Sequence, residues 1–270
     1  MSPYPDVLKL KAIAKQCRLN CLDVLESAGV GHNGGSMSEI DILVGLYFWG
    51  AKTDPKNPLW ENRDRIILSK AHCCEGLYAV LGEAGFFPKE EFKTYGTYGS
   101  RLQGHSEVST PGVEYSGGSL GQGISFAIGK ALALKGKDVY VYCIMGDGEC
   151  GEGQVWEAAA SAATYGLWNL IVIVDDNKYC TIGKTDQLLN IEPLARRWAT
   201  FGFEVKEIDG NDMQQVVDAI QWAKIKTNRP HCIIANTIKG KGVPSWEIKH
   251  PHIEAGQVLF DGIQEGRKAL

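Results

Sequence analysis

The sequence lacks the features that mark membrane, secreted and nucleic-acid-binding proteins. No apolar run is long enough to span a bilayer, and the N-terminal stretch MSPYPDVLKLKAIAK has no apolar signal-peptide core. The formal net charge of -4 gives no basis for binding nucleic acid or an anionic membrane. We therefore expect a cytoplasmic protein with neither kind of partner.

Cysteine pairs and metal-binding cysteine clusters are also missing. None of the eight cysteines forms a C-x-x-C pair, and Cys17 and Cys21 have no histidine or second pair to complete a zinc site. We expect reduced, mostly buried thiols. What the chain does have is the composition of an ordinary globular protein, with 44% hydrophobic and 22% charged residues over 270 positions.

The first third of the chain is predicted to be mainly helical. Apolar residues at helical spacing indicate a long helix that ends near Gly29. The elements expected after it are a glycine-rich turn over 31–38, a second helix over 38–50, a short buried strand over 62–69 and a helix over 70–85.

From residue 138 onward, apolar β-branched runs alternate with helical segments. Strands are predicted over 138–145, 169–176, 203–209 and 230–238, and helices over 153–166, 192–202 and 212–225. This alternation is typical of an α/β fold with a parallel sheet and helices on both faces. The ligands of such sheets bind at the carboxyl ends of the strands.

The chain shows no linker, repeat or low-complexity tract, so we expect one domain over residues 1–270. The segment that starts at Lys239 has weak periodicity. We expect residues 244–270 of it to form a tail that lies over the surface.

Two polar sequences follow neighbouring strands of the predicted sheet. Gly146-Asp147-Gly148 ends one strand, and Asn177 ends the next, thirty positions after Asp147. A single helical crossover of this length places the two strands side by side. Carboxylate and amide oxygens suit Mg²⁺ or Ca²⁺, and the glycines let the backbone approach a phosphate. Each sequence alone is a common turn; the pair at this spacing indicates a metal–diphosphate site.

This pair of motifs resembles the thiamin diphosphate fingerprint, and the chain up to about Val243 resembles the N-terminal, diphosphate-binding domain of transketolases. The motifs that carry the resemblance are GHNGGSMS, NRDRIILSKAH, LQGHSE, TPGVEYSGGSLGQGIS, GDGECGEGQVWEAA, DDNKYCTIGKT and NTIKGKGV. The resemblance implies thiamin diphosphate as cofactor, with Mg²⁺ or Ca²⁺.

The resemblance also implies which residues hold these groups. Asp147, Asn177 and the main-chain oxygen of Tyr179 would ligate the metal. The cofactor-binding set would contain these three residues together with His72, Gly118, Leu120, Gly148, Glu149 and His252. Within that set, Gly148 would meet the diphosphate, and the backbones of Gly118 and Leu120 would touch the aminopyrimidine.

Three early histidines border glycine-rich or helix-entry segments: His32, His72 and His105. A lone histidine is more often a surface or capping residue than a catalyst, but the resemblance implies that His32 and His105 meet oxygens of the bound ketose. His72 would lie near both cofactor and donor. His105 is followed by Ser106 where the family usually has proline, which predicts a less rigid loop.

Five further residues have two interpretations each: Glu152, His250, His252, Lys239 and Lys241. Glu152 is either an acidic residue favoured at a helix N-terminus or part of a catalytic carboxylate network across a dimer interface. Transketolases usually have a Trp-His-Gly sequence whose histidine reaches the diphosphate, and this chain lacks it. By sequence offset, His252 is the nearer replacement and His250 is the alternative. Both histidines could instead lie on the surface. Lys239 and Lys241 are either diphosphate-neutralising or solvated, and we favour solvated.

After this diphosphate-binding domain, we expect no second domain of the pyrimidine-binding kind in the sequence. The resemblance places the glutamate that activates the cofactor in that domain, so we expect one subunit of a split transketolase in an α₂β₂ heterotetramer. Its substrates would be sugars or sugar phosphates. Two alternatives are transfer to an unusual sugar or carrier-bound acceptor and a non-catalytic scaffold. A deoxyxylulose phosphate synthase or 2-oxoacid dehydrogenase subunit fits TPGVEYSGGSLGQG and the histidines less well.

Overall fold

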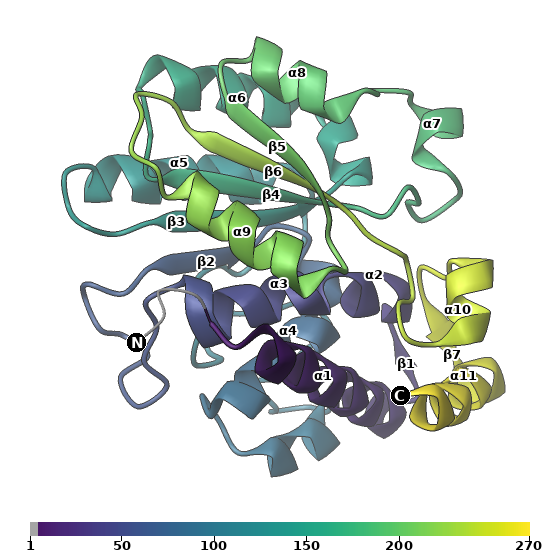
Figure 1. The fold of residues 1–270 in the computed structure, drawn as a ribbon. Coiled ribbons are helices and arrows are strands. Elements are labelled where there is room, and N and C mark those ends of the chain that lie inside the picture. Colours follow the sequence, from purple (N-terminus) through teal and green to yellow (C-terminus); the bar gives the residue numbers. More distant parts are fainter. Residues whose placement is uncertain (1–4) are drawn as a thin grey trace.

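The centre of the molecule is a five-stranded, fully parallel β-sheet in the strand order β2-β3-β4-β6-β5 (Figure 1). The computed structural model describes residues 5–270. The strands of the sheet are β2 (Arg65–Leu68), β3 (Val141–Gly146), β4 (Leu170–Asp176), β5 (Glu204–Asp209) and β6 (His231–Asn236). The predicted strands are therefore confirmed, as is the predicted adjacency of the two strands that precede Asp147 and Asn177.

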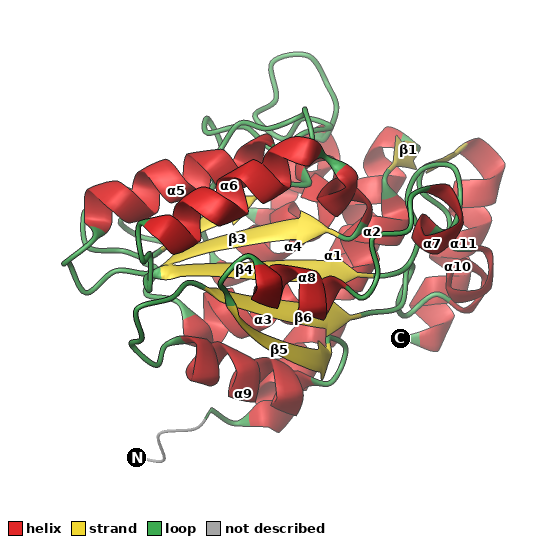
Figure 2. Ribbon diagram, turned by 90° about the horizontal axis from the view of Figure 1, so that it is seen from above, coloured by secondary structure: helices red, strands yellow, loops and turns green. Residues whose placement is uncertain are grey.

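Helices cover both faces of this sheet, which confirms the α/β class (Figure 2). One face carries α5 (Gln122–Leu134), α6 (Gly153–Thr164) and α8 (Leu194–Thr200). The other carries α3 (Ile40–Gly45), the π-helical turn Leu46–Gly50, α4 (Cys74–Ala84) and α9 (Met213–Ala223), with α1 (Val7–Ala28) packed outside α3 and α4. Short helical segments are α2 (Asn33–Ser38), α7 (Thr185–Leu188), α10 (Pro244–Lys249) and the 3₁₀ turns Ala71–Cys73, Lys89–Thr94 and Gly148–Gly151.

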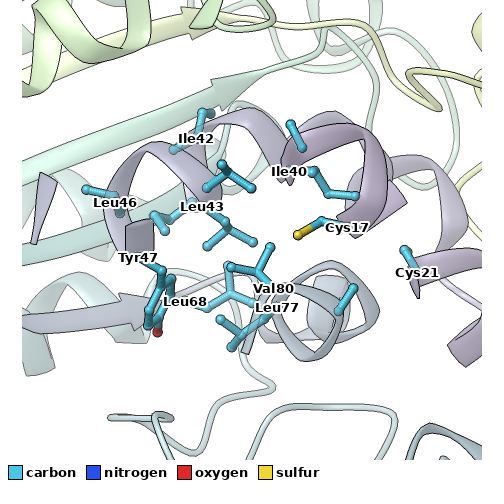
Figure 3. Close-up of a cluster of buried hydrophobic side chains, with 14 of the residues drawn as sticks. Cys17, Cys21, Ile40, Ile42, Leu43, Leu46, Tyr47, Leu68, Leu77 and Val80 are labelled. Carbon is cyan, nitrogen blue, oxygen red and sulfur yellow. The ribbon is translucent and has the colours of Figure 1, made fainter. Parts of the chain in front are cut away.

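Alternate residues of the central strands supply two separate hydrophobic cores. In β4, Ile171 and Ile173 point into the core beneath α3 and α4, whereas Val172 and Val174 point into the core beneath α5 and α6. Figure 3 shows the first core, where side chains of α1, α3, α4 and β2 meet. Because β4 is buried on both faces, its sequence is a continuous apolar run.

The first helix begins and ends where the sequence predicts. The Asp6 side chain accepts hydrogen bonds from the backbone N–H groups of Leu8 and Lys9 at 3.0 and 3.2 Å, which satisfies free donors of the first turn. Gly29 ends the helix in the left-handed region at φ 68°.

The prediction of a glycine-rich turn over 31–38 is wrong, because Asn33–Ser38 forms the helix α2. All six of its residues are buried. Its glycines serve close packing: a Cβ on Gly34 would lie 1.8 Å from the carbonyl oxygen of Pro251, and one on Gly35 would lie 2.5 Å from Cys73 Sγ. Tertiary contacts have overridden the low helix propensity of glycine.

The C-terminal segment 244–270, expected to lie over the surface as a tail, is folded and contributes to the main core. It contains α10, β7 (Glu254–Ala255) and α11 (Gly256–Ala269), and β7 pairs antiparallel with β1 (Val30–Gly31). Trp246, Leu259 and Ile263 are almost completely buried in the core that includes α1. Within residues 5–270, no helix has the length and apolar character required to cross a membrane.

Candidate functional site

A cavity of about 100 Å³ lies at the carboxyl ends of the parallel strands. Its walls come from the segments that follow β2, β3, β4 and β6, so four strands of one sheet direct their ends into one space. Eight of the predicted site residues line this cavity: His72, Leu120, Asp147, Gly148, Glu149, Asn177, Tyr179 and His252. The predicted metal ligands are therefore brought together.

Asp147 supplies a buried carboxylate to this cavity. Thr185 Oγ1 donates to its Oδ2 at 3.1 Å, and no lysine or arginine within residues 5–270 pairs with it. Burial, together with the nearby carboxylates of Asp176 and Asp175, raises the pKa of Asp147 to about 7. A bound cation would offset both effects, because it favours the ionised form.

Asn177 and Tyr179 add neutral oxygens beside this carboxylate. The Tyr179 backbone N–H donates to Asn177 Oδ1 at 3.2 Å, and the Tyr179 carbonyl oxygen faces the ammonium of Lys239. Among the described residues, no group of three or more His, Cys, Asp or Glu side chains is arranged to hold a metal. One carboxylate, one amide and one carbonyl form an incomplete set of hard donors that suits Mg²⁺ or Ca²⁺ completed by phosphate oxygens.

Lys239 is a cavity residue, although its sequence context favoured a solvated position. Its side chain is buried, and its Nζ donates to the carbonyl oxygens of Tyr179 and Cys180 at 3.0 and 3.2 Å. Burial lowers the pKa of its ammonium group. The cavity therefore has both an anionic side chain, Asp147, and a cationic one, Lys239, in its lining. This combination suits a metal–diphosphate unit. The KGKG sequence was the available signal, but only the tertiary structure distinguishes Lys239 from the part-exposed Lys241.

Glu149 lines the cavity, yet both of its oxygens accept hydrogen bonds from the protein. Oε1 accepts from Ser69 Oγ and from the Gly121 N–H at 2.9 Å, and Oε2 accepts from the Gly146 N–H at 3.1 Å. Burial raises the pKa of this carboxyl group. The carboxylate joins the ends of β2 and β3 to the start of α5, and so fixes the shape of the wall.

Four histidines form a cluster beside the cavity. The ring centroid of His32 lies 5.2 Å from His72, 5.9 Å from His105 and 5.3 Å from His252, and His72 lies 5.2 Å from His252. Burial, with help from Lys70, lowers the pKa of His72 to about 2, and burial also lowers the pKa of His32. These two imidazoles are neutral near pH 7, so each offers one donor and one acceptor to sugar oxygens.

The structure distinguishes between the two C-terminal histidines. His252 lines the cavity, with its Nε2 3.3 Å from Thr181 Oγ1, and burial and Lys239 lower its pKa to about 4. His250 instead stacks on the Tyr179 ring at 4.0 Å with an interplanar angle of 21°. His252 therefore belongs to the cavity lining, whereas His250 packs against the ring of a neighbouring residue.

Four predicted residues lie outside the cavity lining, namely His32 and His105 of the histidine cluster, Gly118 and Glu152, and Ser106 also departs from expectation. Gly118 is exposed, and a Cβ there would lie 4.0 Å from His105 Cδ2. Glu152 is the N-cap residue of α6, is exposed and makes no side-chain capping bond. Ser106, predicted to loosen its loop, is buried, and its N–H donates to the Ala71 carbonyl at 3.2 Å. A proline could not make that bond.

A second cavity, of about 350 Å³, adjoins the histidine cluster. Its lining contains His32 together with Val30, Gly31, Tyr95, Thr97 and Ile253, and includes no lysine, arginine, aspartate or glutamate of the described residues. The cluster therefore lies between a charged cavity at the strand ends and an uncharged one.

The fold and the site together define an α/β cofactor-binding domain with metal- and diphosphate-type donors at the carboxyl edge of a parallel sheet. Residues 9–269 match a protein family described as transketolase, thiamine diphosphate binding domain. The chain belongs to this transketolase family, which confirms the resemblance inferred from the motifs.

Individual relatives show how much of a transketolase the chain represents. It is 42% identical to an apulose-4-phosphate transketolase subunit of Actinobacillus succinogenes, over 98% of this chain and 100% of that one. It is also 42% identical to the 6-deoxy-6-sulfo-D-fructose transketolase subunit SqwG of a Clostridium species, over 90% and 89%. The transketolase structure from Campylobacter jejuni matches with a TM-score of 0.88 and 34% identity, covering 96% of this chain but 42% of that one.

Proposed function

We propose that this chain is one subunit of a two-chain transketolase that transfers a two-carbon ketol unit from a ketose or ketose phosphate to an aldose acceptor. The observation that carries the proposal is the convergence of Asp147, Asn177 and Tyr179 on one cavity beside four histidines. A non-catalytic scaffold protein would not need both the oxygen donors and the imidazoles at the same cavity.

The proposed role of each residue is based on its position in or beside the cavity. Asp147, Asn177 and the Tyr179 carbonyl would hold a divalent metal, and Lys239 and His252 would face the diphosphate of thiamin diphosphate. When bound, this cofactor supplies the carbanion chemistry of ketol transfer. His32, His72 and His105 would orient the sugar hydroxyl and carbonyl oxygens and hold or move their protons. His32 and His72 suit this role because burial lowers the pKa of each ring, and a neutral imidazole can both donate and accept.

The proposed enzyme also requires a partner chain. Several relatives are named as single subunits of a transketolase, and full-length transketolases such as the human enzyme align with 98% of this chain but only 45% of their own length. We propose an α₂β₂ heterotetramer in which the second subunit carries the pyrimidine-binding domain. Glu152 would then lie at the contact between subunits, since its exposed carboxylate has no partner among residues 5–270.

The chain alone is expected to show no ketol transfer with thiamin diphosphate and Mg²⁺, whereas co-expression with the product of the neighbouring reading frame restores turnover. The measurement is a coupled assay with xylulose 5-phosphate and ribose 5-phosphate. Full activity of the isolated chain would contradict the two-chain proposal. Calorimetry of the complex with cofactor and metal provides the control: absence of binding would favour a non-catalytic scaffold.

A specialised acceptor is the second candidate for the activity. The relatives named for apulose-4-phosphate and 6-deoxy-6-sulfo-D-fructose show that members of the family named as subunits serve different sugars. The uncharged cavity beside His32 has the size to hold part of such a sugar. Comparing ribose 5-phosphate with branched, sulfonated and carrier-bound acceptors would separate this candidate from a general transketolase.

Replacing His252 with asparagine is expected to lower kcat/KM of the complex by about 10- to 100-fold, because it removes a proposed hydrogen bond to the charged diphosphate, an interaction worth about 1.5–3 kcal/mol. The matched variant His250→Asn should change kcat/KM by less than about threefold. Asparagine tolerates the left-handed backbone of His250, φ 51°, so this control removes the ring without adding strain. A larger loss in the His250 variant would reverse the assignment.

A further inference from the structure

We propose that Asp175 is a positioning residue of the metal site, whose carboxylate fixes the orientation of the Asn177 amide so that Asn177 Oδ1 is presented to the metal. This inference rests on the proposed function, because it concerns how one of the proposed ligands is held. Asp175 was not among the residues that the sequence patterns indicated.

Asp175 lies at the end of β4, and its side chain is completely buried. Its Oδ2 accepts hydrogen bonds from Asn177 Nδ2 at 3.2 Å, Ser38 Oγ at 2.6 Å and Lys70 Nζ at 2.5 Å. Its Oδ1 accepts from Thr237 Oγ1. The donors come from α2, from the segments after β2 and β6, and from the same strand end, so several elements fix the position of one carboxylate.

The orientation of Asn177 follows from the chemistry of this contact. An amide has a donor end and an acceptor end, whereas an ionised carboxylate only accepts. Asn177 must therefore turn Nδ2 toward Asp175, and Oδ1 is left on the opposite side. There Oδ1 accepts the Tyr179 N–H at 3.2 Å, and the residue lines the cavity with Asp147. A flipped amide would direct its N–H group at the metal.

Strand geometry explains why Asp175, and not the adjacent Asp176, contacts Asn177. Residues two apart on an extended chain share a side, so Asp175 and Asn177 face one another while Asp176 points away. Asp176 pairs instead with Lys178. Lys70 also approaches Glu39, with Nζ 3.0 Å from Oε2, so it compensates the negative charge of Asp175 inside the protein.

A swap of the two side chains tests the proposal. In the complex of the full chain with its partner and thiamin diphosphate, Asp175→Asn and Asn177→Asp should each weaken Mn²⁺ binding about tenfold, as is typical when a residue that supports a metal ligand is changed. Asn177→Asp is informative because a carboxylate ligand would ordinarily bind a cation more tightly. Here its new carboxylate would oppose that of Asp175.

The double variant Asp175→Asn/Asn177→Asp is expected to bind Mn²⁺ more tightly than Asn177→Asp alone, because it removes the carboxylate at 175 that opposes the new carboxylate at 177, so the two losses do not add. Asp176→Asn serves as the matched control, because Asp176 is the neighbouring buried carboxylate and pairs with Lys178 rather than with Asn177. It should leave Mn²⁺ affinity unchanged, and each single variant should regain most of its kcat at saturating metal.

Three outcomes would overturn the inference: tighter or unchanged binding in Asn177→Asp, losses that simply add in the double variant, or an equal loss in Asp176→Asn. If Asp175→Asn fails to fold, the sign of the change in Asn177→Asp still decides. Failure of the unsubstituted complex to bind Mn²⁺ with the cofactor would instead contradict the proposed function, so the two failures are distinguishable.

Discussion

Asp147→Asn is expected to weaken metal-dependent binding of thiamin diphosphate by about 100-fold, equivalent to about 2.7 kcal/mol. Asp147 is the one carboxylate among the three proposed ligands, and its burial removes competing water that would otherwise screen its charge. Asparagine keeps the shape and an oxygen donor but loses the negative charge. Calorimetric titration of the complex with cofactor at fixed Mg²⁺, and with Mg²⁺ at fixed cofactor, measures the loss.

The same substitution should not destabilise the cofactor-free protein. The pKa of Asp147 is raised from its ordinary value of 3.8 to about 7, so the folded state binds this proton more tightly than the unfolded state. The carboxylate therefore costs stability as pH rises from about 4 through about 7, and Asp147→Asn removes that cost. At pH 8 the thermal midpoint of the cofactor-free variant should equal or exceed that of the original, while near pH 4 the two should agree.

Asp176→Asn provides the comparison for both measurements. Asp176 is also buried at the end of β4, but it pairs with Lys178 and is not part of the cavity lining. Its substitution should leave cofactor affinity within about threefold. Equal losses in Asp147→Asn and Asp176→Asn would mean that general negative charge, rather than a specific ligand, holds the metal.

The parts of this site that sequence patterns predicted are those set by local order along the chain. Apolar runs such as residues 169–176 identify buried strands, and the glycines beside Asp147 mark where β3 ends. Since the carboxyl ends of neighbouring parallel strands meet at one edge, Asn177 could be assigned to the same cavity as Asp147 even though a whole helix separates them in the sequence.

The parts that the patterns missed depend on contacts between distant segments. Residues 33–38 were predicted to form a turn because glycines are poor helix formers, yet they form α2 where the chain is packed closely on all sides. Lys239 was predicted to be solvated because lysines of turns usually are, but it is buried, with its stem beside Gly34 and its Nζ donating to the Tyr179 and Cys180 carbonyl oxygens. Neither outcome is determined by residues within one helical turn of the position.

Gly34→Ala is the second substitution with a large expected effect, because it acts where α2 meets the C-terminal segment. A Cβ at this position would lie 1.8 Å from the Pro251 carbonyl oxygen and 3.0 Å from Lys239 Cε. The Gly34 carbonyl also accepts the Gly240 N–H at 2.9 Å. Backbone cannot yield as a flexible side chain can, so α2 and the segment before His252 must separate.

We expect Gly34→Ala to lower the free energy of unfolding by about 3 kcal/mol, the upper part of the usual range for overpacking, and to lower kcat/KM of the complex by more than about tenfold. Both Lys239 and His252 would be displaced from the cavity, so the apparent cofactor affinity should fall with the activity. The measurements are denaturant unfolding of the chain and calorimetry of the complex.

Gly129→Ala separates this effect from the general consequence of replacing a glycine. Gly129 lies in the middle of α5, and a Cβ there meets no atom within 4 Å. Alanine is the better helix former, so this variant should raise the free energy of unfolding by about 0.5–1 kcal/mol and leave cofactor affinity unchanged. If Gly34→Ala behaved in the same way, the close contact between α2 and Pro251 could not be what holds His252 at the cavity.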